Sequence, residues 1–101
     1  MIPGISEADC QRLVQELNWH PEIKKVILFG SRAMGNFRPG SDINLALVFE
    51  YPFPFNSWLD LQLRMDELEL AQKIDLVDFG HIHNQDLIDH ILRAGKVIFG
   101  T

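Results

Sequence analysis

Three short apolar segments, residues 25–29, 42–49 and 73–79, alternate along the chain with stretches whose apolar residues recur at helical spacing. Each segment contains β-branched residues and is bounded by polar or turn-forming residues, which predicts a β-strand. Strands that alternate with helices pack as an α/β or α+β layer. The chain has 101 residues, enough for one such core and too few for two. We therefore predict a single domain over residues 1–101, with helices packed against a small mixed sheet of three to four strands.

The helical spacing places the first three helices. Ser6 is expected to cap a helix that ends before Pro21, and the segment 31–40 is expected to form a helical turn followed by a loop. Asn56 or Ser57 is expected to cap a longer helix, whose apolar side is either core or a partner-facing surface. That side comprises Trp58, Leu61, Met65 and Leu68.

The remaining segments complete the layer. The last helix is expected to start at Asn84 or Asp86 and to end at Gly95, in the C′ position that favours a left-handed glycine. Residues 96–99 then form a short closing strand. The aromatic and Pro-interleaved segment 51–55 is expected to fold onto the core as a loop, or alternatively to stack on a base or contact another subunit.

The charge balance excludes several classes of partner. Nine Lys and Arg residues stand against 14 Asp and Glu residues, a net charge of −5. Such a chain has no general affinity for the nucleic-acid backbone or for anionic membranes, so neither is an expected partner. No apolar run approaches the ~20 residues of a membrane span. The only cysteine, Cys10, is expected in the core, and without a secretory signal we expect a cytoplasmic protein.

Polar residues with the chemistry of a metal–nucleotide site interrupt or follow the three strands. Gly30 and Ser31 come directly after the first strand, where free backbone N–H groups and a hydroxyl suit a phosphate. Asp42 and Asn44 share one face of the second strand, and oxygen side chains spaced in this way hold hard divalent cations. Asp75 is expected to be buried in the third strand, where a carboxylate needs a partner or a metal.

The same residues carry a resemblance to a known family. Residues 28–35 (LFGSRAMG) and 41–46 (SDINLA) resemble the signature of the DNA-polymerase-β-like nucleotidyltransferases, which is Gly-Ser, ten intervening residues and Asp-x-Asp. The spacing of ten residues is intact here, and residues 73–78 (KIDLVD) resemble the strand that carries the family's third carboxylate. Over residues 5–99 the chain is similar to the minimal nucleotidyltransferases, which are often encoded beside a HEPN-domain partner.

This resemblance implies a polymerase-β-like fold and a function. The implied reaction is the Mg²⁺-dependent transfer of a nucleotide, with AMP from ATP as the expected case, to a hydroxyl on a HEPN toxin that the chain neutralises as an antitoxin. A complex with a HEPN protein is expected, and a homodimer is the alternative assembly. The implied catalytic and metal-binding residues are Asp42, Asn44 and Asp75, and the implied nucleotide-binding residues are Gly30, Ser31, Arg32 and Lys73. Arg32 is equally well interpreted as a solvated helix residue.

Position 44 departs from the family pattern, because the second Asp of Asp-x-Asp is Asn44 here. An amide oxygen can bind Mg²⁺, but it brings no charge to offset that of the metals. Turnover is therefore expected to be about 10²-fold slower or more. The alternative is a catalytically inactive pseudo-nucleotidyltransferase that acts as an interaction protein or antitoxin by direct binding.

The histidines are expected to lie outside this site. His20 and His90 are expected at the surface. His81 and His83 alternate after the third strand, but without a third ligand close in sequence they are not expected to bind a metal.

Overall fold

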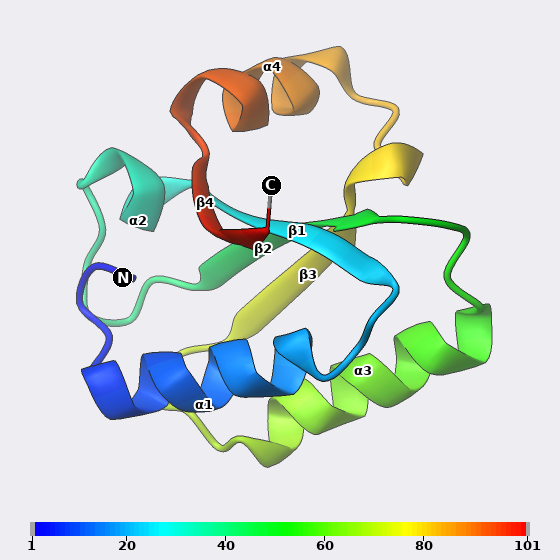
Figure 1. The fold of residues 1–101 in the computed structure, drawn as a ribbon. Helices are drawn as coiled ribbons and strands as arrows, with labels where there is room; N and C mark the ends of the chain where they lie inside the picture. Colours follow the sequence, from blue (N-terminus) through cyan, green and yellow to red (C-terminus); the bar gives the residue numbers. More distant parts are fainter. Residues whose placement is uncertain (1, 101) are drawn as a thin grey trace.

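The computed structural model describes residues 2–100 and shows helices and strands alternating along the chain (Figure 1). The elements are α1 (Glu7–Asn18), β1 (Ile23–Phe29), α2 (Ser31–Met34), β2 (Ile43–Phe49), α3 (Phe55–Glu67), β3 (Ile74–Asp78), the 3₁₀ turn η1 (Phe79–His81), α4 (Gln85–Ala94) and β4 (Lys96–Gly100). The predicted alternation is confirmed, including the helical turn after the first strand and the closing strand.

The four strands form one mixed sheet in the order β3-β2-β1-β4. β1 pairs antiparallel with both β2 and β4, whereas β2 and β3 are parallel neighbours joined through α3. The prediction of a small mixed sheet is confirmed. The strand order leaves β3 and β4 as the two edges, which decides how exposed the residues of these strands are.

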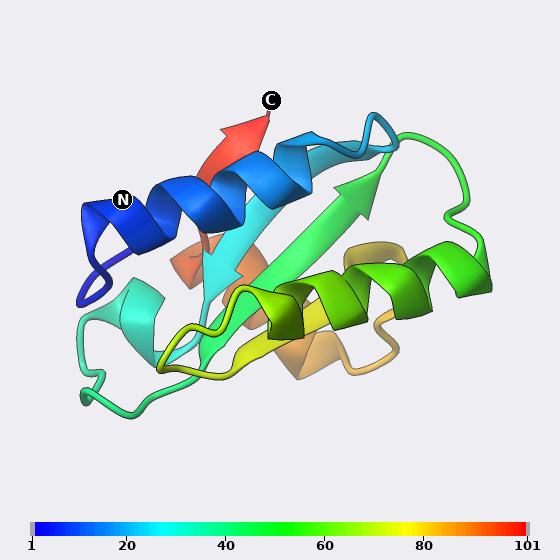
Figure 2. The same cartoon turned by 90° about the horizontal axis from the view of Figure 1, so that it is seen from below.

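Helices cover both faces of the sheet. α1 and α3 lie side by side on one face, and α4 lies on the other (Figures 1 and 2). The residues of β2 alternate accordingly: Leu45 and Leu47 pack in the core under α1 and α3, whereas Ala46 packs with Ile91 of α4. This alternation is what a strand buried on both faces requires.

The apolar side of α3 is core. Leu61 and Met65 are buried, and Trp58 and Leu68 pack against the same cluster, so the partner-facing alternative for these residues is wrong. The opposite side of α3 exposes a different apolar stripe, made of Phe55, Leu59 and Leu63. In the segment 51–55, only Phe53 folds onto the core, where it stacks on Phe49 with ring centroids 4.5 Å apart. Tyr51 and Phe55 are exposed, so the prediction of a loop folded onto the core holds for Phe53 alone.

The caps of the first and last helices follow the predicted pattern. Ser6 Oγ accepts a hydrogen bond from the Asp9 N–H, and Asn84 Oδ1 accepts one from the Leu87 N–H. The prediction for α3 is wrong, because this helix begins at Phe55, one residue before the expected caps. Its N-cap is Pro54, whose carbonyl already accepts the first helical hydrogen bond, from the Trp58 N–H.

Several other predicted ends also differ. The first strand begins two residues earlier than predicted, at Ile23, and the second and third begin one residue later, at Ile43 and Ile74. The third strand stops at Asp78 instead of residue 79, because the Asp78 carboxylate accepts the Gly80 N–H and turns the chain into η1. Gly95 does cap α4, but with φ −67° and ψ 150° it is not left-handed. A glycine is required at this position because a Cβ would clash with the Ile91 carbonyl and the Ile27 side chain.

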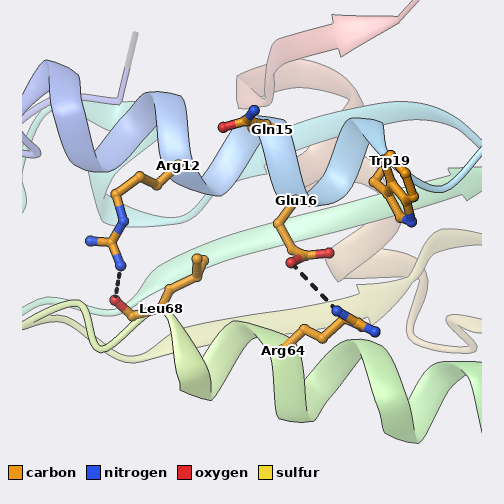
Figure 3. A pocket seen from close by; sticks show the side chains of 6 residues that line it. All are labelled: Arg12, Gln15, Glu16, Trp19, Arg64 and Leu68. Carbon is orange, nitrogen blue, oxygen red and sulfur yellow. Dashed lines mark hydrogen bonds and ion pairs between the residues drawn. The ribbon is translucent and has the colours of Figure 1, made fainter.

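Polar contacts bridge α1 and α3 along a surface groove (Figure 3). Arg12 Nη2 donates to the Leu68 carbonyl at 2.6 Å, and Arg64 Nη1 lies 4.0 Å from Glu16 Oε1. Arg64 Nε also donates a hydrogen bond to Asp60 Oδ2, and this bond raises the pKa of the Arg64 guanidinium. The groove lies over α1 and α3, on the opposite face of the sheet from α4. Across residues 2–100, no helix is both long enough and apolar enough to span a membrane.

Candidate active site

The predicted site residues meet at one end of the sheet. Strand register pairs Phe29 of β1 with Asn44 of β2, and Asn44 in turn with Asp75 of β3. Paired residues project to the same face, and Phe29 packs with the core under α4. The side chains of Asn44 and Asp75 therefore project on the α4 face, at the end of the sheet where β1 finishes and β2 and β3 begin.

Asp42 and Lys73 lie just before the strands that carry Asn44 and Asp75. Asp42 directly precedes β2 and Lys73 directly precedes β3. The Ile43 N–H donates to the Lys73 carbonyl at 2.8 Å, which holds these two segments side by side. Asp42 and Lys73 are both exposed, so their charges are available to a ligand at this end of the sheet.

The Gly30-Ser31 turn closes the site from the β1 side. Gly30 has φ 80° and ψ −155°, and a Cβ at this position would lie 2.6 Å from Asn44 Nδ2. Only glycine satisfies both the backbone angle and this close approach. Ser31 then opens α2, and its N–H has no acceptor among the described residues, as expected for the first residue of a helix.

Arg32 is buried and holds the loop that leads to Asp42. It is 1% exposed, so the interpretation as a solvated helix residue is wrong. Its guanidinium donates to the Pro3 carbonyl at 2.8 Å and the Ser41 carbonyl at 2.9 Å, and also to two carbonyls of the intervening loop. The Phe37 ring covers the guanidinium, with its centroid 4.8 Å from Cζ. Arg32 therefore shapes the site by fixing Ser41, directly before Asp42.

Asp75 is exposed, so the prediction of a buried carboxylate is wrong. The apolar residues on either side suggested burial, but Asp75 projects on the α4 face of an edge strand, and α4 packs against β1, two strands away. Exposure removes the cost of an isolated buried charge and leaves the carboxylate open to a cation.

The donors at this end of the sheet suit Mg²⁺. Asp42, Asn44 and Asp75 offer carboxylate and amide oxygens, which are the ligands that hard divalent cations prefer. Within residues 2–100, however, no three His, Cys, Asp or Glu side chains lie close enough together to hold a metal ion. Asn44 lies between Phe29 and Asp75 in the row of paired residues across β1, β2 and β3. A carboxylate at this position would make all three candidate ligands acidic, together with Asp42 and Asp75.

His90 belongs to this site, although it was expected at the surface. This α4 residue is half-buried, and its Nε2 accepts a hydrogen bond from the Gly30 N–H at 3.0 Å. Sixty residues separate the two in sequence, so no local pattern signalled the contact. The available signal was the helical spacing of α4, which places His90 next to the buried Ile91 and near the sheet.

The site and the fold define a nucleotidyltransferase domain of the polymerase-β type. The family model "Polymerase beta, Nucleotidyltransferase" matches residues 11–101. The chain belongs to this family, and the predicted fold is confirmed. None of the curated proteins compared with the chain matches it.

Several solved structures share the fold. A toxin–antitoxin complex with AMP-PNP matches with a TM-score of 0.75 and 24% identity, over 91% of this chain and 73% of that one. A tri-AMPylated Shewanella oneidensis HEPN toxin in complex with an MNT antitoxin matches with a TM-score of 0.69 and 21% identity, over 96% of this chain and 74% of that one. A MntA–HepT toxin–antitoxin complex matches with a TM-score of 0.67 and 21% identity, over 95% and 74% of the two chains.

Proposed function

We propose that this chain is a Mg²⁺-dependent nucleotidyltransferase that transfers AMP from ATP to a hydroxyl of a HEPN-domain toxin, with its activity weakened by Asn44. The observation that carries the proposal is the meeting of the Gly30-Ser31 turn with Asn44 and Asp75 on one face of the sheet. Structures of similar fold described as an AMP-PNP complex and as an AMPylated HEPN toxin support the choice of nucleotide and acceptor.

Each residue has a role that follows from its place. The Gly30-Ser31 turn binds the β- and γ-phosphates through the Ser31 N–H and the Ser31 hydroxyl, and Lys73 offsets phosphate charge. Asp42, Asn44 and Asp75 are the ligands for Mg²⁺. When bound, the metal stabilises the charge that develops on the phosphate oxygens.

The proposed reaction needs only ATP and the acceptor hydroxyl as reactants. The acceptor hydroxyl oxygen bonds to the α-phosphorus of ATP, the bond from that phosphorus to the bridging oxygen breaks, and pyrophosphate leaves. The hydroxyl proton passes to the Asp75 carboxylate and then to water. Because Asp75 is exposed on the edge strand, it can reach an acceptor that approaches from outside the domain.

Asn44 also supports a second candidate function, that of a pseudo-enzyme which neutralises its partner by contact. The amide leaves only two protein carboxylates, Asp42 and Asp75, to offset the charge of the metals. Transfer of label from ATP labelled at the α-phosphate to the HEPN partner separates the two functions. Labelled partner supports the enzyme, whereas toxin neutralisation without label supports the pseudo-enzyme.

Replacing Asp42 with alanine is expected to weaken Mg²⁺–ATP binding at least tenfold, because one of the two carboxylates is lost. Isothermal titration calorimetry measures the effect. Asp86→Ala is the matched control, since Asp86 is an exposed acid in the first turn of α4. Unchanged ATP affinity in Asp42→Ala would place the nucleotide site elsewhere.

The chain is expected to assemble with a HEPN-domain protein, and a homodimer is the alternative assembly. The exposed side of α3 supports association, because Phe55 and Leu63 are 72% and 61% exposed. Light scattering of the chain alone and mixed with a HEPN-domain protein is expected to show a complex in the mixture. A monomer in both samples at high concentration contradicts this expectation.

A further inference from the structure

Within residues 2–100, His90 of α4 is the one side chain that hydrogen-bonds to the backbone of the Gly30-Ser31 turn. Its Nε2 accepts the Gly30 N–H at 3.0 Å, and its ring packs edge-to-face on Phe29, with centroids 6.2 Å apart. The contact therefore joins α4 to the last residue of β1 and to the first residue beyond it.

The hydrogen bond fixes the chemical state of the ring. Because Nε2 accepts, it carries no proton, and a neutral imidazole then carries its proton on Nδ1. His90 therefore serves as an acceptor toward the turn, and it does not present a donor to a phosphate through Nε2.

The Gly30 peptide is held from two directions. Its N–H is bound by His90, and its Cα side is closely approached by Asn44 Nδ2, which leaves no room for a Cβ. Gly30 takes a backbone conformation, φ 80°, from which a glycine moves easily if nothing restrains it. The N–H that His90 binds belongs to the Phe29–Gly30 peptide, and the Gly30 carbonyl, in the next peptide, accepts from the N–H groups of Ala33 and Met34. The direction in which Ser31 presents its N–H and hydroxyl depends on both peptides, of which His90 holds the first.

We propose that His90 is a positioning residue for the nucleotide site, which holds the Phe29–Gly30 peptide and so fixes the entry into the turn from which Ser31 faces the triphosphate of ATP. The inference rests on the proposed function, since it concerns the same phosphate-binding turn. His90 acts through Gly30 and takes no part in the transfer of the nucleotide. Losing this hold is expected to weaken ATP binding more than it weakens the fold.

Two substitutions separate positioning from packing. His90→Gln keeps an acceptor, because the glutamine amide oxygen can take the place of Nε2, whereas His90→Leu fills the space without an acceptor. His83→Leu makes the same chemical change at an exposed histidine outside the site. Calorimetry with Mg²⁺–ATP, thermal melting and the ¹H–¹⁵N resonance of the Gly30 amide are measured for all variants and for the wild type.

His90→Leu is expected to weaken Mg²⁺–ATP binding about three- to tenfold, the effect of one hydrogen bond, and to shift the Gly30 amide resonance. His90→Gln is expected to stay within about twofold of the wild type, as is His83→Leu. Wild-type affinity in His90→Leu, or equal losses in His90→Leu and His90→Gln, would overturn the inference and leave the proposed function standing. If neither the wild type nor the Asn44→Asp variant binds Mg²⁺–ATP, the proposed function fails and the inference fails with it.

Discussion

The Asn44→Asp variant is expected to transfer AMP about 100-fold faster than the wild type. Asn44 lies between Phe29 and Asp75 in the row across three strands, so a carboxylate at this position joins Asp42 and Asp75 at the same end of the sheet. The protein would then supply three negative charges to the metals instead of two. Asp and Asn have nearly the same shape, so the close approach to Gly30 is preserved.

The same change is expected to destabilise the metal-free protein slightly, by about 0.5–1 kcal/mol, because a third carboxylate is added to two exposed ones. Mg²⁺ is expected to restore the melting temperature, and thermal melts with and without the metal measure both effects. Asn18→Asp is the matched control, since it adds the same charge at an exposed position in α1, on the far face of the sheet.

The label-transfer assay is run side by side on the wild type, Asn44→Asp and Asn18→Asp, with ATP and the HEPN partner. If the wild type is as fast as Asn44→Asp, the amide is an adequate ligand and the expected weakening is wrong. If neither form transfers AMP or binds Mg²⁺, the assignment of the metal site is wrong.

Replacing Arg32 with methionine is expected to lower the free energy of unfolding by about 2–4 kcal/mol. The buried guanidinium donates to carbonyls of Pro3, Ser41 and the loop between residues 37 and 41, and methionine offers none of these hydrogen bonds. For a domain of this size the loss corresponds to a fall in melting temperature of roughly 10–20 °C. Chemical denaturation and thermal melting followed by circular dichroism measure the two quantities.

Arg38→Met is the matched control, because Arg38 is exposed in the same loop. Its side chain makes no hydrogen bond and no ion pair within residues 2–100. It is expected to change stability by less than about 0.5 kcal/mol. Arg32→Lys is expected to fall in between, since an ammonium cannot reproduce the planar set of donors. A melting temperature of Arg32→Met equal to that of the wild type would show that the guanidinium contacts contribute nothing to the fold.

The sequence predicted those parts of the site that local patterns encode. The strand over residues 42–49 was predicted from its alternation, and this alternation also placed Asp42 and Asn44 on one face. The turn at Gly30 could be predicted because the strand before it is apolar and stops there. The ten-residue spacing then connected the two parts and indicated the family.

The features that the sequence did not predict depend on contacts between distant segments. The exposure of Asp75 follows from the position of β3 at the sheet edge, and the order of strands is set by packing over the whole domain. Arg32 looks like an ordinary residue of a helical turn until the Pro3 carbonyl, 29 residues away, lies against it. His90 likewise gains its role only when α4 folds back over β1.

The position of β3 at the edge of the sheet also bears on the size of the acceptor. An enzyme that works on small molecules usually surrounds both reactants with walls that exclude water. Here the carboxylate proposed to take the acceptor's proton lies on the outermost strand, and the part of the chain that the structure describes adds no strand beyond it. A side chain on the surface of a folded protein can therefore approach the exposed Asp75 directly, without unfolding.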